Sequence, residues 1–418
     1  MLFYSKLGII LFLLHCYAVS AKSVKSNAYS EEVRDFLISK FPKNLGYGHY
    51  HSDVNFIANR RNHDCHVIKN KIHLIAGRFQ PTVEIIDPAL GDAPHEIVRN
   101  DTVLELNHIF TVIVDPLNDE DAKKYEWEIW VPCGFSGHEF NQEKSIATAR
   151  IIRKKRNGPD PYEVFVGPKL PYPSGSCSAA LLKIDGPDKP GHICMFGGSD
   201  GAHDSGHFHR EVKCYDRAKQ KWNFITHVPV AIDHHSMVRV PEVQCPGNGT
   251  IGPYIFIFHG RTHAFGKAID VVHAWKLPEH KQQVNIPGYH MSSFKNASWE
   301  IFATDDYPRD AAASLITEDG RYVIAFGGLT HGMKQDTVSH TRLKRIRVLD
   351  LCTRKWHTSK VELDNPRYAI EPCLNGRYPI ICGGTYEGPT TTYEPRFHGN
   401  LASCEIFDTE EIVNNLVV

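Results

Sequence analysis

Six short apolar segments, each ending in glycine, recur along the chain at intervals of 56 to 68 residues. The segments are KIHLIAG, EIWVPCG, HICMFGG, YIFIFHG, YVIAFGG and YPIICGG, and their last glycines are residues 77, 134, 198, 260, 328 and 384. Such a regular recurrence predicts a chain built from copies of one supersecondary unit. It disfavours a single irregular domain of this length.

Each unit has the pattern of four antiparallel strands. A shorter apolar stretch and a turn rich in Gly, Asp, Asn and Pro precede every glycine-ending segment, as hairpins require. A third β-rich stretch follows, such as VEIIDP or RIRVLD, and tryptophan marks a fourth in WNFI, WEIF and WHTS. Four strands per unit at a fixed period predict a β-propeller with six blades. Seven blades are the alternative, if the N-terminal region or the second unit hides another.

The best-formed units carry a strand ending in Gly-Gly, then a tyrosine, then a tryptophan. Gly197-Gly198 with Tyr215 and Trp222 has the full pattern, Gly327-Gly328 with Trp356 has Leu349 at the tyrosine position, and Gly383-Gly384 has only the glycines. The remaining units are degenerate and keep Gly77, Gly134 and Gly260. In these residues the chain resembles the kelch family over residues 64–418. The resemblance implies an all-β, kelch-type β-propeller in which these residues are structural.

Residues 1–21 have the features of a secretory signal peptide: Lys6, an apolar run over 7–14, and small residues up to Ala21. We therefore expect a secreted, extracellular protein cleaved after Ser20 or Ala21, with an N-terminal membrane anchor as the alternative. No later segment is apolar enough to span a bilayer. Residues 22–63 form a separate N-terminal segment, in which 30–41 predicts a short helix. Either a strand such as 54–58 or the C-terminal stretch 411–418 would complete the last blade.

Cysteines and sequons agree with an extracellular location. Cleavage would remove Cys16 and leave ten cysteines, an even number that predicts up to five disulfides of unspecified pairing. Asn100, Asn248 and Asn296 lie in Asn-x-Ser/Thr sequons and are candidate glycosylation sites. The formal charge is −1, from 47 basic and 48 acidic residues, which argues against a nucleic-acid partner.

Polar residues gather just beyond the glycines. Four of the six units place a histidine three to five residues past the glycine, and in a propeller these loops open on the same face as the connections between blades. The ligand-face candidates are Arg78, His138, His203, His234, Arg261, His263, Arg309, His331, Arg367, Tyr386 and Glu387. Because His234 and His235 are adjacent, strand geometry would let only one of them serve a site. For the arginines, ion pairs between blades are the competing explanation.

No cofactor is expected, although His203, His207 and His209 form a loop cluster that offers imidazole ligands to a metal ion. The function expected from the fold is an extracellular protein- or glycan-binding module acting through this His/Arg-rich face. The kelch resemblance also allows a carbohydrate-active enzyme, similar to sialic-acid mutarotases or to copper-radical oxidases. No catalytic motif of either class carries over residue by residue, and the oligomeric state is left open.

Overall fold

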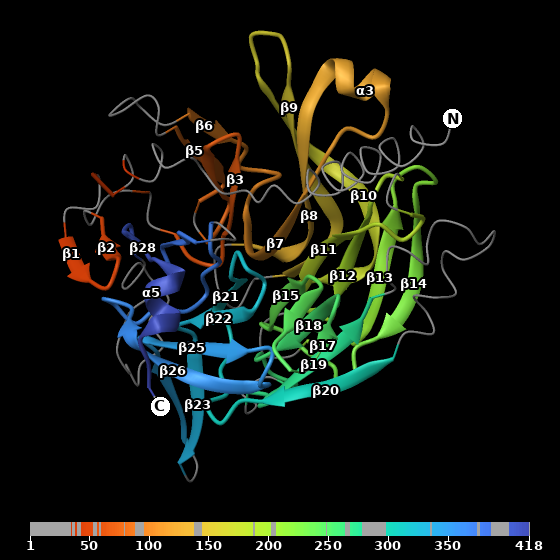
Figure 1. Cartoon of the computed structure of the whole chain (residues 1–418). Coiled ribbons are helices and arrows are strands. Elements are labelled where there is room, and N and C mark those ends of the chain that lie inside the picture. The colour runs from red at the N-terminus through yellow and green to blue at the C-terminus, as the bar shows by residue number, and fades with distance from the viewer. Residues whose placement is uncertain are drawn as a thin grey trace, which may run out of the picture.

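Six antiparallel sheets are arranged around a central axis in the computed structural model (Figure 1). It describes residues 35, 38–39, 43–52, 57, 60–78, 80–87, 96–137, 144–186, 189–201, 206–247, 249–263, 268–277, 298–334, 337–373, 377–385 and 401–417. Each sheet contains one of the six glycine-ending strands. The prediction of a six-bladed propeller is therefore confirmed, and the seven-bladed alternative is wrong.

Blades 1 to 3 follow the chain in simple order, with each strand hydrogen-bonded to the next. Blade 1 contains β3 (Asp64–Ile68), β4 (Lys71–Ile75), β5 (Thr82–Ile86) and β6 (Glu96–Arg99). Blade 2 contains β7 (Leu106–Val114), β8 (Tyr125–Ser136), β9 (Lys144–Lys155) and β10 (Tyr162–Ser174), with α3 (Asp119–Lys124) in its first hairpin. Blade 3 contains β11 (Ser178–Leu182), β12 (His192–Phe196), β13 (Glu211–Asp216) and β14 (Lys221–His227).

Blades 4 and 5 carry additional hairpins. Blade 4 contains β15 (Ser236–Val240), β18 (Tyr254–Phe258), β19 (Val271–Lys276) and β20 (Trp299–Thr304), with the small hairpin β16 (Val243–Cys245) and β17 (Gly249–Ile251). Blade 5 contains β21 (Ala313–Ile316), β22 (Tyr322–Phe326), β25 (Arg345–Asp350) and β26 (Lys355–Glu362). A projecting hairpin of β23 (Leu329–Lys334) and β24 (Thr337–Arg342) separates β22 from β25.

Blade 6 is completed by the N-terminal segment. Its strands β27 (Ile380–Cys382) and β28 (Cys404–Ile406) are followed in the sheet by β2 (His49–His51) and β1 (Lys43–Gly46). Figure 1 shows β1 and β2 beside β28 although they come from opposite ends of the chain. The closing strands thus lie upstream of 54–58. The C-terminal residues instead form α5 (Thr409–Asn414) and β29 (Leu416–Val417), which pairs with β26 of blade 5.

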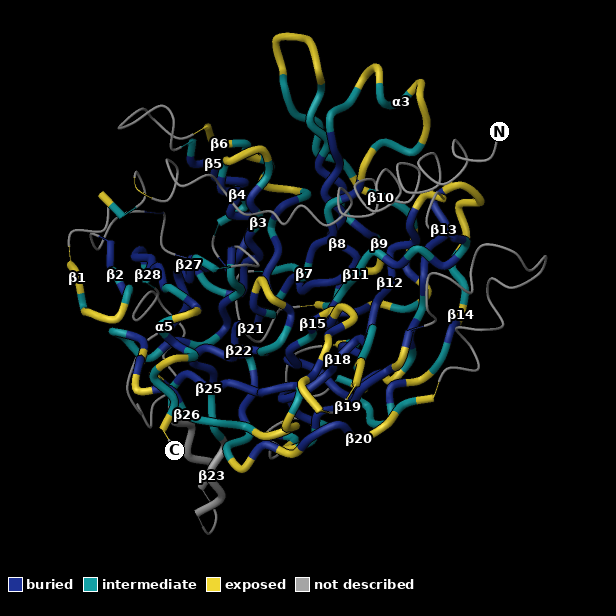
Figure 2. The backbone as a smooth tube through the Cα atoms, in the orientation of Figure 1, coloured by how far each residue is buried: buried dark blue, intermediate teal, exposed yellow. Residues whose placement is uncertain are grey.

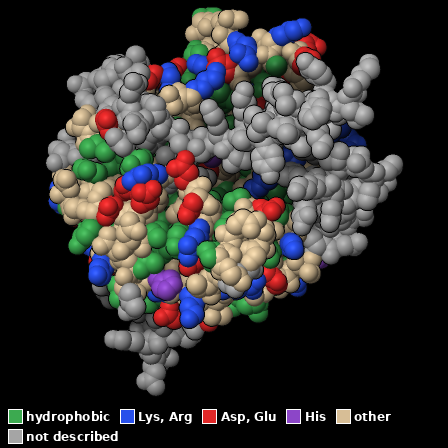
Figure 3. All heavy atoms as spheres, in the orientation of Figure 1, with side chains coloured by type: hydrophobic (Ala, Val, Ile, Leu, Met, Phe, Trp, Pro, Cys, Tyr) green, Lys and Arg blue, Asp and Glu red, His purple; other side chains and the backbone are tan. Residues whose placement is uncertain are grey.

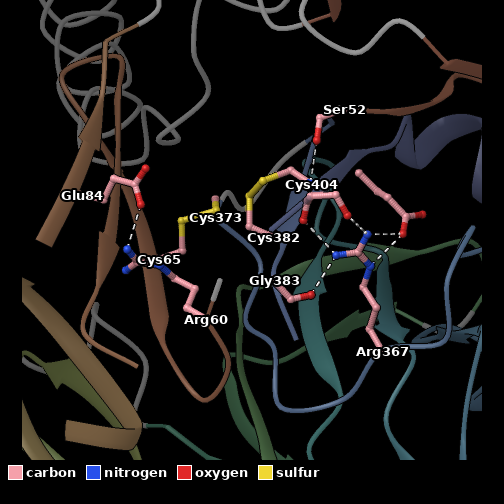
Figure 4. Close-up of a disulfide and its surroundings, with 11 residues drawn as sticks. Ser52, Arg60, Cys65, Glu84, Arg367, Cys373, Cys382, Gly383 and Cys404 are labelled. Carbon is pink, nitrogen blue, oxygen red and sulfur yellow. Dashed lines mark hydrogen bonds and ion pairs between the residues drawn. A yellow bond between two sulfur atoms is a disulfide. The ribbon is translucent and has the colours of Figure 1, made fainter. Parts of the chain in front are cut away.

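The seam between blades 6 and 1 is also closed covalently. Cys65 of β3 is bonded to Cys373, which precedes β27, and Figure 4 shows this disulfide beside the Cys382–Cys404 bond within blade 6. The other disulfides are Cys133–Cys177, Cys194–Cys214 and Cys245–Cys352. All ten cysteines counted from the sequence are paired, which confirms the expectation of five disulfides.

The double glycines allow adjacent blades to approach each other. Gly327 and Gly328 have φ angles of 60° and 93°, in the left-handed region that glycine adopts without penalty. A Cβ atom on Gly327 would collide with the carbonyl oxygen of Arg367 in the next blade, and the Gly328 amide donates to that same oxygen at 2.7 Å. The glycines are therefore required by the contact between blades.

A closed circle of backbone hydrogen bonds runs around the central channel. One residue per blade, at or before the start of the innermost strand, contributes a carbonyl oxygen and has a φ angle of 48° to 57°. These ring residues are Asn62, His108, Ser176, His234, Ala311 and Ala369. The N–H of each donates to the ring carbonyl of the preceding blade over 2.9 to 3.3 Å, except that in blade 2 the donor is Ile109, at 3.5 Å.

Burial differs between the inner strands and the hairpin tips. Figure 2 shows buried residues along the inner strands and exposed residues at the hairpin tips, including the tip between β9 and β10. The strands β12 and β18 are buried along their entire length, so both of their faces pack against neighbouring blades. In the described residues no helix has the length and apolar character needed to cross a membrane.

Candidate functional site

The side chains of the six ring residues divide the channel into a polar and an apolar part. Asn62, His108, Ser176 and His234 are polar, whereas Ala311 and Ala369 present only methyl groups. All six line one cavity of about 40 Å³ at the centre of the propeller. Because the same backbone position is filled by alanine in two blades, the polar side chains in the other four are not demanded by the ring itself.

Hydrogen bonds and ring contacts link the polar ring residues. The side-chain amide of Asn62 lies 2.6 Å from Nε2 of His108, and the imidazoles of His108 and His234 meet edge-on with their centroids 4.5 Å apart. Ser176 Oγ lies 3.4 Å from Nε2 of His234. Four side chains from four blades thus form a contiguous polar surface along one side of the channel.

Asp233 and Arg261 both contact the side chain of His234. Asp233 Oδ2 lies 3.0 Å from Nδ1 of His234, and Asp233 Oδ1 accepts from Nε of Arg261 at 3.0 Å. Burial would raise the pKa of Asp233, but the adjacent His234 and Arg261 lower it well below its usual range. Asp233 is therefore a carboxylate at neutral pH, and it fixes the orientation of the imidazole that faces the channel.

A second tier of residues lies above the ring. In each blade, the residue after the last glycine of the glycine-ending strand is bonded or paired to the residue just before the ring residue. These mouth pairs are Arg61 with Arg78, Asn107 with Phe135, Gly175 with Ser199, Asp233 with Arg261, Asp310 with Leu329, and Tyr368 with Thr385. The arginine-containing pairs belong to blades 1 and 4, which are three blades apart and so on opposite sides of the six-bladed mouth.

Arg61 is the more accessible of these arginines. Its side chain is half-buried, and Nη1 donates to Thr385 Oγ1 at 3.3 Å. Its Nε has no hydrogen-bond partner among the described residues. Because this Nε is buried, a carboxylate at the mouth would be bound by the terminal nitrogens of the guanidinium.

The arginines of blades 5, 6 and 1 have a different role. Arg309, Arg367 and Arg60 occupy the position two residues before the ring residue, and all three are fully buried. Arg367 donates to Glu405 Oε1 at 2.7 Å and to the Gly383 carbonyl at 2.8 Å, and Arg60 bonds to Glu84 at 2.8 Å, as Figure 4 shows. Arg309 donates to the carbonyl oxygens of Gly327 and Arg345. Arg309 and Arg367, predicted on the ligand face, are thus directed into the sheets.

These arginines and the ring residues define two parts of the propeller. We call blades 5, 6 and 1 the closing arc, because they carry the three buried arginines, the two alanine ring residues and the seam. We call blades 2, 3 and 4 the histidine arc, because they carry His108, Ser176 and His234. In the histidine arc the position of the buried arginines is taken by Leu106, Ser174 and Ile232.

The wall of the channel below the ring contains further titratable groups. His63 and His235 follow ring residues, and both border the cavity. Burial lowers the pKa of His235 to about 3, and burial together with Arg60 lowers the pKa of His63 well below its usual range. Burial and the neighbouring Asp64 raise the pKa of Glu371, which also lines the cavity, well above normal. These groups are therefore held in their neutral forms.

The expectation for His234 and His235 needs correction. Both residues border the cavity, although alternation along a strand would send them to opposite faces. His234 has φ of 50° and precedes β15, so the chain turns at this residue instead of continuing as an extended strand. The left-handed turn removes the alternation on which the prediction relied.

Several predicted face residues lie outside the described residues: His138, His203, Tyr386 and Glu387. His331 lies in β23, and its side chain is not described. His263 is exposed on the loop after Arg261, with Nδ1 3.2 Å from Thr262 Oγ1. Arg78 is buried at the mouth. Arg261 and His234 are thus the two candidates that the structure brings into direct contact.

The loop cluster of histidines is only partly described. His207 is exposed, whereas His209 is buried and lies against Tyr172 with tilted rings whose centroids are 3.9 Å apart. Of the sequons, Asn248 and Asn296 lie outside the described residues. Asn100 follows β6, and its Oδ1 accepts hydrogen bonds from the amides of Thr102 and Val103. Glycosylation and metal binding at these residues stay predictions.

The tyrosine and tryptophan of the repeat pack against each other. Tyr215 and Trp222 are opposite one another on β13 and β14, with ring centroids 5.2 Å apart. Leu349 and Trp356 form the equivalent pair in blade 5, and Trp275 and Trp299 form it in blade 4. These residues cover the outer part of each blade and do not border the cavity.

Sequence reasoning missed Arg61, Asn62, Ser176 and Asp233. The signal that identifies them is the position of the inter-blade connection, not the residue type. When the six connections are aligned at the ring residue, Arg61 and Asp233 occupy one column and Asn62 and Ser176 the next. The ring residues differ too much in chemistry to form a recognisable motif.

The comparisons with known proteins support the fold. No protein-family model and no curated protein matches the sequence. A solved structure described as the structure of YjhT matches with a TM-score of 0.58 and 11% sequence identity, over 82% of this chain and 93% of that chain. At this identity the likeness concerns the fold alone. The chain forms an all-β, kelch-type propeller of six blades.

Proposed function

We propose that this protein is an extracellular binding propeller that recognises a carbohydrate bearing a carboxylate, at the mouth of its central channel. The observation that carries the proposal is the arrangement of Arg61 and the Asp233–Arg261 pair on opposite sides of a mouth lined by Asn62, His108 and His234. The five disulfides support a location outside the cell, where such bonds persist.

The polar groups at the mouth match the chemistry of an acidic sugar. A guanidinium recognises a carboxylate through paired N–H donors. Imidazole, hydroxyl and carboxamide groups each donate and accept, which suits sugar hydroxyls. Figure 3 shows acidic and basic side chains interspersed over the visible surface, so a general surface field does not explain selectivity for an anion. Selectivity has to come from local contacts.

The size of the cavity determines where the ligand binds. A volume of about 40 Å³ accommodates a few water molecules but not a sugar ring. The ligand therefore rests above the ring residues, in contact with the mouth pairs, and directs one polar group toward His108 and His234. Binding then requires no opening of the hydrogen-bonded ring.

Calorimetric titration with N-acetylneuraminic acid, glucuronic acid and glucose tests this proposal. We expect binding of an acidic sugar and no measurable binding of glucose. Arg61→Met should weaken binding at least tenfold, since loss of a charged hydrogen bond costs about 1.5–3 kcal/mol. The matched control is Arg99→Met, which removes an exposed arginine paired with Asp101 on the outermost strand of the same blade. Equal affinity of the two variants for the acidic sugar would contradict the proposal. Binding of glucose as tightly as the acidic sugars would contradict it as well.

A second candidate function is interconversion of sugar anomers, and the Asp233–His234 pair favours it. This reaction needs a proton removed from the anomeric hydroxyl and one delivered to the ring oxygen, or the reverse. An imidazole oriented by a buried carboxylate 3.0 Å away is suited to this exchange, and His108 lies beside it. Exchange spectroscopy of a bound acidic sugar would show accelerated anomer interconversion. Loss of the acceleration in His234→Gln, with binding retained, would establish catalysis beyond binding.

A further inference from the structure

One arrangement recurs in several blades, where the end of the third strand lies beside the start of the glycine-ending strand. We call this place the corner of the blade. Asp216 and Asp350 end the third strands of blades 3 and 5, and Asp87 directly follows the third strand of blade 1. In blade 6, Asp408 lies two residues after the end of β28. In three of these blades a basic residue pairs with the aspartate: Lys71 with Asp87 at 2.7 Å, Arg321 with Asp350 at 3.1 Å, and Arg377 with Asp408 at 3.0 Å. A fixed cation therefore neutralises the aspartate in each of them.

Blade 3 fills this corner differently. The residue facing Asp216 across the strands is His192, because the adjacent pair is Ile193 opposite Tyr215. The residue before His192 is Gly191, so no arginine reaches over as it does in blades 5 and 6. A second carboxylate, Asp185 from the preceding turn, approaches His192 Nε2 at 2.8 Å. The corner thus has an imidazole at the position that Lys71 occupies in blade 1, and it gains one acidic group. Its lysine, Lys219, reaches Asp216 from the turn that follows β13 instead.

The groups in this corner have the donor types and separations of a metal site. One ligand atom from each of Asp185, His192 and Asp216 lies within 4.8 Å of the other two. The His192 side chain is only 4% exposed, and its Nδ1 has no hydrogen-bond partner among the described residues. Asp185 is 29% exposed, so water has access to complete a coordination shell.

The charge balance also leaves room for a cation. The two carboxylates carry a charge of −2, and the ammonium group of Lys219 lies 2.8 Å from Asp216 Oδ2. The Lys219 side chain is 71% exposed, so it can be displaced into solvent at little cost. Asp216 Oδ1 accepts from the amides of Ala218 and Lys219, which holds the carboxylate in place without using Oδ2.

We propose that Asp185, His192 and Asp216 bind one divalent transition-metal ion, which supplies the cation that lysine or arginine supplies in the other blades. One imidazole with two carboxylates suits Zn²⁺ or Mn²⁺ better than Ca²⁺, which prefers six to eight oxygen ligands. Zn²⁺ takes four ligands in most protein sites, so one water would complete the set. The ion holds the turn before β12 against the end of β13, far from the channel mouth.

The competing explanation is that His192 itself becomes the cation by protonation. The two explanations differ in what they predict for metal-free protein. If protonation suffices, added metal leaves the protein unchanged. If the corner is a metal site, a single equivalent of metal binds and stabilises the fold, since a ligand that binds only the folded state raises its stability.

Titration of untagged, chelator-treated protein with Zn²⁺, followed by calorimetry and thermal unfolding, tests the proposal. We expect one equivalent to bind with a rise in the unfolding temperature. Asp185→Asn should weaken that binding at least tenfold, because it removes one ligand charge from a partly exposed position. His192→Lys should abolish it and should leave the metal-free protein at least as stable, since it recreates the Lys71–Asp87 corner.

Two controls separate this corner from other metal-binding groups. Asp350→Asn removes the equivalent carboxylate in blade 5, and His207→Gln removes an exposed imidazole of the loop cluster; both should bind Zn²⁺ as the unchanged protein does. Absence of a stoichiometric binding event in the unchanged protein would overturn the proposal. Unaltered affinity in both Asp185→Asn and His192→Lys would also overturn it, because the metal would then be held elsewhere.

Discussion

The closing arc and the histidine arc use the same backbone geometry and distribute their polar groups in opposite ways. In the closing arc, charged groups lie behind the ring: Arg309, Arg367 and Arg60 are fully buried and bonded within the sheets. In the histidine arc, aliphatic or small residues take that place, and the polar side chains stand at the ring itself. Buried arginines thus stabilise the blades of the closing arc, whereas the ring residues of the histidine arc are all polar and Asn62 is the polar ring residue of the closing arc.

This difference separates what the fold requires from what it merely permits. A left-handed residue favours Asn and His, so His108, His234 and Asn62 have a conformational explanation. Ala311 and Ala369 hold the same conformation without any polar group, at φ of 48° and 57°. The conformational preference is therefore insufficient to explain three neighbouring polar side chains that contact one another. Under the proposed function, binding of a ligand accounts for their being adjacent.

The largest predicted effect tests the structural role of the closing arc. Arg367→Met leaves the carboxylate of Glu405 buried without its main counter-charge, which should lower the free energy of unfolding by about 3–5 kcal/mol in urea denaturation. The control is Lys43→Ala, which breaks an ion pair whose lysine is 54% exposed and should cost less than about 1 kcal/mol. Similar losses from the two variants would remove the distinction between the arcs.

Lowering the pH should reduce the free energy of unfolding by protonating the same carboxylate, that of Glu405. Burial would raise the pKa of Glu405, but Arg367 and the hydrogen bond with His49 lower it to about 2 in the folded protein. The unfolded chain takes up this proton near pH 4.3, so the stabilisation is complete above that pH and declines as the pH falls toward 2. The expected loss is about 3 kcal/mol, measured by denaturation at pH 6 and at lower pH. A flat profile between pH 5 and 2.5 would refute the assignment.

The seam disulfide should matter more than a disulfide within a blade. Cys65–Cys373 closes 308 residues of chain, whereas Cys194–Cys214 closes 20. Loop-closure entropy predicts that replacing both cysteines of the seam by serine costs about 2 kcal/mol more than the same change in blade 3. Equal losses, measured by thermal and urea unfolding, would mean that pairing of β2 with β28 closes the ring without help.

The smallest effect tests the ring conformation. Ala369→Gly should leave stability unchanged or raise it by up to about 1 kcal/mol, because glycine relieves the left-handed conformation of an alanine. Ala325→Gly in the extended strand β22 should instead destabilise by about 1 kcal/mol. Destabilisation of equal size in both variants would show that the ring position imposes no left-handed requirement.

Sequence was most informative where the fold repeats. The glycine positions predicted the six blades correctly, because a β-carbon at Gly327 would collide with the next blade and one at Gly328 with the start of its own blade. The closing strand β2 was missed because its sequence, His-Tyr-His, has no apolar alternation. Its histidines are buried by partners distant in sequence: His49 bonds to Glu405 and stacks on Phe407.

The candidate site was predicted only in part. Arg261 and His234 were identified, and they are in contact. Arg309 and Arg367 were also predicted on the ligand face, because the sequence does not show whether a charged residue near a connection points into the sheet or toward the channel. The partner decides: Glu405 lies within blade 6, and no local pattern links it to Arg367, 38 residues away.

Paired measurement of stability and ligand binding in His108→Ala and His234→Ala most directly tests whether the polar ring side chains serve a ligand. We expect each variant to stay within about 1 kcal/mol of the unchanged protein in urea denaturation and to lose at least tenfold in affinity for an acidic sugar. Destabilisation of several kcal/mol with unchanged affinity in the folded fraction would instead assign these histidines to the fold.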